Sequence, residues 1–258
     1  MKYLNRFLII LCLLFNNLIA QEHHSSIPTP AQIKAFINQA TKHDPNHLPS
    51  SCELFYAQKP DDLILSILIP TLVERSLQFE QIFTKLLLQI LQANLQNQIE
   101  IVFYRDNRDA TVGYKRNQLI ANASGKYTCF VDDDDDVHAQ YITLIYQALL
   151  QNCDCVKLLG IYSENHIKRL FIHSIAYQSW FEFNQVYYRP PNHLNPIKRE
   201  ITSKFQFPNH MNYSEDADWS MQICRAGAIK TEANLQVPYY FYNFDAQKSV
   251  CWQRANQK

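Results

Sequence analysis

The sequence predicts a single α/β domain built around a mainly parallel β-sheet. Residues 63–69 form an unbroken apolar run that ends at Pro70, which is typical of a strand buried on both faces. Apolar side chains then recur at helical spacing over residues 77–95, and a second short strand is predicted over residues 99–104. Strand, helix and strand in this order indicate a β-α-β unit with a right-handed crossover.

The same alternation continues through the middle of the chain. We predict a helix over residues 114–122 and a strand over residues 127–131, followed by a helix over residues 141–150 and a strand over residues 156–162. The chain has 258 residues, of which 47% are hydrophobic, and this is enough to bury one sizeable core. One domain is therefore expected, over residues 61–258.

The first 60 residues are predicted to lie outside this domain. Residues 1–20 have the pattern of a signal peptide, with basic residues before the apolar run 7–15 and Ala20 closing a cleavage site. The run is too short to span a bilayer comfortably, so we expect export and no stable membrane span. Lipid attachment at Cys12 is the less favoured alternative. Residues 21–60 are polar and rich in proline, and are interpreted as an N-terminal extension.

Charge and cysteine content exclude some classes of function. The formal net charge is zero, which argues against a general nucleic-acid-binding or anionic-membrane surface. Cleavage after Ala20 would leave six cysteines, an even number that permits disulfides in an oxidising compartment without revealing their pairing. Cys153 and Cys155 are separated by one residue and no second pair has zinc-like spacing, so no zinc site is expected.

Five consecutive aspartates, residues 132–136, directly follow the predicted strand 127–131. An acidic run is most often a solvated surface, but carboxylates crowded at the end of a buried strand repel one another, and a bound divalent cation relieves that repulsion. Hard oxygen ligands favour magnesium or manganese. Thr71 and Asp106 also follow strands, and ligands of open α/β sheets bind beyond the carboxyl ends of strands. Three strand ends should therefore meet at one crevice.

The ordered motifs of the chain resemble those of family 2 glycosyltransferases. These motifs are Ser-Ile-Leu-Ile-Pro-Thr at residues 66–71, Asp106, Gly-Lys-Tyr at residues 125–127 leading into the aspartates, and Ser-Glu-Asp-Ala-Asp-Trp at residues 214–219. The resemblance covers residues 63–225. It implies a single-domain nucleotide-diphospho-sugar transferase fold, the A-type glycosyltransferase fold. The donor-binding half would span about residues 61–140 and the acceptor half about residues 141–258.

The resemblance also implies roles for residues of the donor site. Carried over by position, Thr71 and Asp106 would lie near the base and ribose of the nucleotide. Asp132 would lie near the ribose or the metal, and Asp134 would bind a Mn²⁺ or Mg²⁺ ion. Without the resemblance, Thr71 simply ends a strand and Asp106 caps a turn.

Asp216, with Glu215 beside it, would be the catalytic base that removes a proton from the acceptor hydroxyl. The alternative is structural, because acidic side chains are stabilising at the N-terminus of a helix.

Four further residues are interpreted as donor-binding candidates. Lys115 and Arg116 precede the aspartates and would face the nucleotide, although a solvated first turn of a helix suits them as well. His193 and Lys198 belong to a predicted loop that leads into a helix and would form a lid over donor phosphate or acceptor.

These expectations favour a metal-dependent, inverting glycosyltransferase that moves a sugar from a nucleotide-diphosphate donor to a glycan, protein or lipid acceptor. One alternative is a non-catalytic protein of the same fold that binds a glycan or a partner. Another is a calcium-binding adhesion module that uses only the aspartates, but this leaves the motif at residues 214–219 unexplained. Because nucleotide-sugars are scarce outside cells, an exported transferase should act in a donor-supplied lumen or inside another cell.

Overall fold

The computed structural model describes the backbone of residues 51–55 and the complete residues 63–165 and 167–244. The predicted signal peptide and most of the predicted N-terminal extension lie outside these residues. No helix in the described ranges combines the length and the apolar character needed to cross a membrane.

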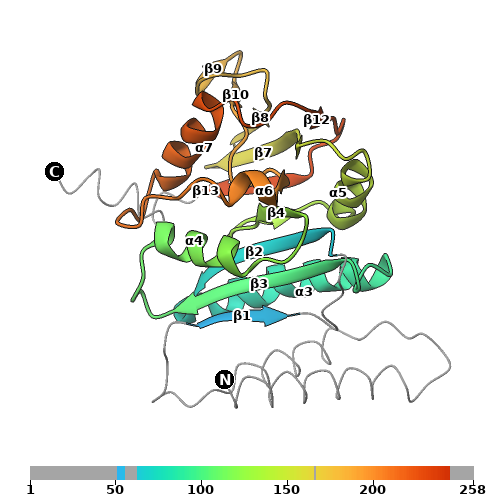
Figure 1. Cartoon of the computed structure of the whole chain (residues 1–258), viewed down its shortest axis with the longest axis vertical. Coiled ribbons are helices and arrows are strands. Elements are labelled where there is room, and N and C mark those ends of the chain that lie inside the picture. Colours follow the sequence, from blue (N-terminus) through green and yellow to red (C-terminus); the bar gives the residue numbers. More distant parts are fainter. Residues whose placement is uncertain (1–50, 56–62, 166, 245–258) are drawn as a thin grey trace.

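Two β-sheets and flanking helices make up the described chain, which confirms the predicted α/β class (Figure 1). The first sheet carries the three predicted strand ends and mixes strand directions. Its central strands β3, β2 and β4 are parallel, as predicted, whereas β11 runs antiparallel to both of its neighbours. In spatial order its strands are β1 (Ser51–Phe55), β3 (Ile99–Asp106), β2 (Leu65–Leu72), β4 (Tyr127–Phe130), β11 (Ile197–Lys198), β6 (Cys155–Val156) and β12 (Glu232–Ala233).

The edge strand β1 corrects the predicted domain boundary at residue 61. It lies within the predicted extension, yet it pairs antiparallel with β3 along five residues, from Ser51 opposite Arg105 to Phe55 opposite Ile101. Pairing at this edge satisfies backbone groups of β3 that would otherwise be left open. The sheet therefore includes residues 51–55.

A second sheet, which the sequence pattern did not predict, is built from strands of the second half of the chain. Its order is β5 (Asp136–Val137), β13 (Tyr240–Phe244), β7 (Leu158–Glu164), β8 (Ile167–His173), β10 (Val186–Arg189) and β9 (Phe181–Phe183). The strand predicted over residues 156–162 is divided between the two sheets, because β6 ends at Val156 and β7 begins at Leu158. Strand β13 pairs with β5 and so brings the end of the described chain beside the aspartates.

Helices cover both faces of the first sheet, with α3 behind the strands and α4 in front of them in Figure 1. Leu65, Ile67 and Ile69 of β2 face a core shared with α3 and α5, whereas Leu68 faces the core under α4 and α7. Burial on both faces explains the continuous apolar run in the sequence. The helical elements are η1 (Val73–Arg75), α3 (Ser76–Gln92), α4 (Val112–Asn122), α5 (Tyr141–Leu149), α6 (Arg199–Thr202) and α7 (Glu215–Arg225).

A buried carboxylate fixes the approach to β4. Glu100 accepts hydrogen bonds from the Ser66 hydroxyl at 2.5 Å and from the Ser124 amide at 2.6 Å, while the Gly125 amide donates to the Ser66 hydroxyl at 2.8 Å. A Cβ atom at Gly125 would lie only 2.6 Å from the backbone nitrogen of Ser66. The chain can therefore enter β4 in this register only because residue 125 has no side chain.

The four cysteines whose side chains the structure describes, Cys129, Cys153, Cys155 and Cys224, are all free. Burial raises the pKa of the Cys129 thiol to about 12. The disulfides that an even cysteine count permits are therefore not formed among these four.

We predict that Gly125→Ala destabilises the protein by about 1–3 kcal/mol, the usual cost of overpacking a tight site. Urea unfolding would measure the loss. The control is Asn122→Ala, at an exposed position at the end of α4. Equal unfolding midpoints for the two variants would contradict the proposed close approach.

Candidate active site

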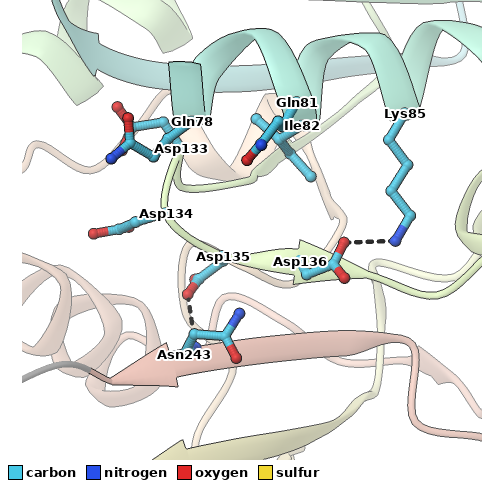
Figure 2. A pocket seen from close by; sticks show the side chains of 9 residues that line it. All are labelled: Gln78, Gln81, Ile82, Lys85, Asp133, Asp134, Asp135, Asp136 and Asn243. Carbon is cyan, nitrogen blue, oxygen red and sulfur yellow. Dashed lines mark hydrogen bonds and ion pairs between the residues drawn. The ribbon is translucent and has the colours of Figure 1, made fainter. Parts of the chain in front are cut away.

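The last two aspartates of the run anchor its loop. Asp135 accepts hydrogen bonds from the Tyr240 hydroxyl at 2.7 Å and the Asn243 amide at 3.1 Å, both on β13. Asp136 pairs with Lys85 of α3 at 2.6 Å. Figure 2 shows Asp135, Asp136, Lys85 and Asn243 among the side chains that line a cavity beneath α3, whose volume is about 410 Å³. Both carboxylates are therefore used to hold the loop between a helix and the second sheet.

Asp133 and Asp134 both pair with Arg75, a residue that the sequence did not predict for the site. Arg75 Nη1 lies 2.7 Å from Asp133 and 3.0 Å from Asp134, and the Thr71 hydroxyl donates to Asp133 at 2.7 Å. Asp133 is buried, whereas 49% of the Asp134 side chain is exposed. Burial among the loop atoms, together with Asp132 and Asp133, raises the pKa of Asp134 to about 6 despite Arg75. The only sequence signal for Arg75 is a basic residue shortly after a strand end.

The carboxylate of Asp106 is buried and binds two neighbouring groups of the protein. Its side chain is 1% exposed, and its two oxygens accept from Lys115 Nζ at 2.5 Å and from the Ala110 amide at 2.8 Å. Lys115 also donates to the Thr71 carbonyl at 3.3 Å. In this structure Asp106 therefore positions Lys115 and the Ala110 amide, and its contact with base or ribose stays a prediction.

Arg116 is buried in the centre of the site. Its Nη2 atom lies 3.2 Å from Asp132 and its Nε atom 3.2 Å from Glu215, while its guanidinium lies 5.1 Å from the centre of the Phe130 ring. Although burial opposes ionisation, Arg116 and His193 hold the pKa of Asp132 well below its usual range. A solvated helical turn, the alternative for this arginine, is wrong because only 6% of the Arg116 side chain is exposed.

The His193 ring lies between the carboxylates of Asp132 and Asp216, beyond hydrogen-bond distance of both. Its Nε2 atom lies 3.6 Å from Asp132 and its Nδ1 atom 3.7 Å from Asp216. The predicted lid is wrong, since residues 190–197 are buried and the His193 carbonyl accepts a hydrogen bond from the Phe130 amide at 2.9 Å. This loop is a fixed wall of the site.

Lys198 lies away from the site. It stands opposite Tyr127, at the start of β4, whereas the aspartates follow the end of that strand. Its ammonium pairs with Asp154 at 3.0 Å. The prediction of donor binding by Lys198 is therefore wrong, because β11 is antiparallel and carries this residue to the opposite edge of the sheet.

Two cavities meet at Arg116 and Asp132. The larger cavity, of about 760 Å³, lies at the strand ends, and the smaller cavity, of about 360 Å³, lies against α7 and the second sheet. Thr71, Arg75, Lys115 and Asp134 line the larger cavity, and His193, Glu215, Asp216 and Arg189 line the smaller one.

The carboxylates of Glu215 and Asp216 differ in exposure. Both belong to the first turn of α7, where the helix dipole stabilises negative charge. Glu215 is 5% exposed and is paired with Arg116, whereas Asp216 is 23% exposed. Burial raises the pKa of Glu215, although Arg116 opposes this. Asp216 is therefore the better placed of the two to reach a ligand.

The larger cavity offers oxygen donors for a metal but no complete ligand set. In the described ranges, no three His, Cys, Asp or Glu side chains are grouped so that they could hold an ion by themselves. Asp132 and Asp134 both line the cavity. One or two carboxylates, completed by phosphate oxygens and water, are the usual protein contribution to a magnesium site. The donor set fits Mg²⁺ or Mn²⁺ on that basis.

Comparisons with known proteins identify relatives of this chain. The family model described as glycosyl transferase family 2 matches residues 84–219. The glycosyltransferase GlyA of Streptococcus pneumoniae serotype 4 is 27% identical over 81 residues, which are 31% of this chain and 12% of GlyA.

Solved structures of S. aureus TarS, residues 1–349, have a similar fold at low identity. The structure in complex with UDP-GlcNAc has a TM-score of 0.50 at 12% identity, and the match covers 71% of this chain and 59% of that one. For the fragment without a named ligand, the TM-score is 0.49 at 12% identity, with 70% and 60% covered. The match thus spans less than two thirds of the length of these relatives.

We predict that Arg116→Met destabilises the protein by about 3–5 kcal/mol, because it leaves buried carboxylates without their cation. Adding Glu215→Gln should restore part of this loss. Urea unfolding of the single and double variants would measure both effects. The control is Arg108→Met, which breaks an exposed pair with Glu74 and should cost about 0–1 kcal/mol. Equal losses for the two arginines would contradict a structural role for the buried network.

Proposed function

Since this chain belongs to the family 2 glycosyltransferases, we propose that it transfers a sugar from a nucleotide-diphosphate donor to an acceptor hydroxyl. The main support for this proposal is the buried cluster in which Arg116 and His193 lie between Asp132 and the first two residues of α7, Glu215 and Asp216. This cluster joins the two cavities, so a group bound at the strand ends lies next to the carboxylate of Asp216. The predicted A-type glycosyltransferase fold is confirmed.

The larger cavity is the proposed donor site. Its volume of about 760 Å³ lies within the roughly 300–1,000 Å³ that is usual for small-molecule sites. Arg75, Arg108, Lys115 and Arg116 line it together with Asp109, Asp132, Asp133 and Asp134, so a diphosphate that brings a divalent cation suits this lining. A TarS structure contains UDP-GlcNAc, so UDP-sugars are the first donors to test.

Asp134, with Asp132, is proposed to hold Mn²⁺ or Mg²⁺ together with the donor diphosphate. When bound, such an ion neutralises negative charge on the leaving diphosphate. Asp134 is the more favoured ligand because it is more exposed than Asp132 and Asp133, the other aspartates of the run that line the cavity. Thr71 and Arg75 fix Asp133 beside it and so set the path of the loop.

Asp216 is proposed to act as the base. It accepts the proton of the acceptor hydroxyl, the oxygen forms a bond to the anomeric carbon, and the bond to the diphosphate breaks on the opposite face. The configuration at that carbon is thereby inverted. Glu215 is a positioning residue, since its carboxylate is buried against Arg116. His193 sets the separation of Asp216 from Asp132.

Asp134→Ala should abolish the manganese-dependent part of donor binding, because Asp134 is the most exposed of the three aspartates of the run that line the larger cavity. The measurement is a thermal-shift screen of nucleotide-diphosphates and their sugars with and without Mn²⁺, since a ligand that binds only the folded state raises Tm. Asp136→Ala, which removes the carboxylate paired with Lys85, is the matched control and should keep the manganese dependence.

If no nucleotide raises the Tm of the wild-type protein, the non-catalytic alternative is favoured. Tight calcium binding without any nucleotide binding would favour the adhesion module.

Asp216→Asn should lower the rate of donor turnover by about 10²–10⁴-fold, the usual contribution of a general base, while donor binding persists. The rate is measured as release of free nucleotide from the donor that the screen selects. Asp218→Asn is the control, because Asp218 lies in the same helical turn but pairs with Gln222 at the surface. An unchanged rate in a folded Asp216→Asn variant would remove Asp216 from the base role.

A further inference from the structure

Arg189 differs from the other arginines and lysines of the two cavities. Arg75, Arg108, Lys115 and Arg116 each pair with a carboxylate within 4 Å. Arg189, at the end of β10, lines the smaller cavity and has no carboxylate partner among the residues that the structure describes. A partly buried cation without a counter-ion is costly, so this position indicates a charge supplied by a ligand.

Aromatic side chains hold the Arg189 guanidinium. Its central carbon lies 4.1 Å from the centre of the Trp180 ring and 6.0 Å from that of Tyr187. Stacking uses the face of the guanidinium and leaves the N–H groups on its edge for a planar or multidentate anion. Burial lowers the pKa of Arg189, although Asp216 opposes this, and an arginine remains protonated in proteins.

His173 stands opposite Arg189 in the pairing of β8 with β10 and lines the same cavity. One nitrogen of its ring is a second polar group that has no partner among the described residues. Asn195 Nδ2 donates to the Val156 carbonyl at 2.9 Å, so its Oδ1 is an acceptor, and His173 Nδ1 lies 3.3 Å from that oxygen. Burial lowers the pKa of His173 well below its usual range, so the ring is neutral and Nδ1 carries the proton. His173 Nε2 is left as an acceptor without a partner among the described residues.

Another part of the wall is aromatic. Tyr162 stacks on Tyr242 with ring centres 5.4 Å apart and on Phe244 at 5.9 Å, and all three line the smaller cavity. Aromatic faces beside polar groups suit a sugar ring, which has apolar C–H faces and hydroxyl edges. The cavity therefore combines an aromatic wall, a free hydrogen-bond acceptor on His173 and a cation without a carboxylate partner among the described residues.

We propose that the acceptor is an anionic saccharide, whose phosphate or carboxylate group binds Arg189 while one of its hydroxyls reaches Asp216. This inference rests on the proposed transferase function and names the class of its acceptor. The donor diphosphate is the less suitable partner for Arg189, because this residue lines the smaller cavity and not the larger one.

The test compares binding of glucose 6-phosphate, glucuronate and glucose to the full chain by calorimetry, at constant ionic strength with saturating UDP and Mn²⁺. We expect at least one anionic sugar to bind about tenfold or more tightly than glucose, as one charge-assisted contact allows. Which of the two binds better distinguishes phosphate from carboxylate. Arg189→Met should abolish the difference, and Arg189→Lys should retain part of it.

Arg169→Met is the matched control. Arg169 also lies near Tyr187, at 5.8 Å from its ring centre, but it pairs with Glu182 and does not line the smaller cavity. This variant should keep the preference for anionic sugars. Equal binding of all three sugars by the wild-type protein, or a preference that survives in Arg189→Met, would overturn the inference.

The remaining outcomes separate this inference from the proposed function. Weaker UDP binding in Arg189→Met, with sugar binding unchanged, would assign the arginine to the donor and overturn the acceptor role. If UDP does not bind the wild-type protein but Arg189-dependent binding of anionic sugars persists, the transferase proposal fails and the anion site stands. If UDP binds and turnover occurs without any anionic preference, only the inference fails.

Discussion

The buried guanidinium of Arg116 is the interaction on which the site depends. A cation in the interior must be compensated, and here Asp132 and Glu215 provide the negative charge. Asp132 follows the end of β4, and Glu215 is the first residue of α7. These two residues are more than 80 positions apart along the chain. The need to neutralise one arginine therefore fixes the distance between the two halves of the domain.

The aspartates after β4 divide into structural and accessible groups. Asp135 and Asp136 hold the loop against β13 and α3, as Figure 2 shows. Asp133 is held by Thr71 and Arg75 at the end of β2. Asp133 and Asp135 are buried and Asp136 is paired with Lys85, so a ligand at the strand ends reaches mainly Asp134 and Asp132, which line the larger cavity. Carboxylates that seem equivalent in the sequence thus have different partners and different exposure.

Local patterns predicted the first half of the fold well. Three features depend only on neighbours within a few residues. They are the apolar run of β2, the helical spacing of apolar residues in α3, and the strand β4 that leads into the aspartates. The second sheet was missed because its strands are short or mixed in polarity, and pairings such as β13 with β7 join residues about 80 positions apart. The role of Asp106 was missed for a related reason, since its burial depends on how α4 packs.

By itself, the sequence determined the α/β class, the strand ends that carry Thr71 and the aspartates, and the acidic motif that holds Asp216. These features follow from periodicity and from motif order, which are properties of neighbouring residues. Only the tertiary structure decided that Arg116 is buried between two carboxylates, that Lys198 faces the wrong edge and that Arg189 is left unpaired among the described residues. Charge pairing and burial depend on which distant segments pack together, and a local sequence pattern does not predict that packing.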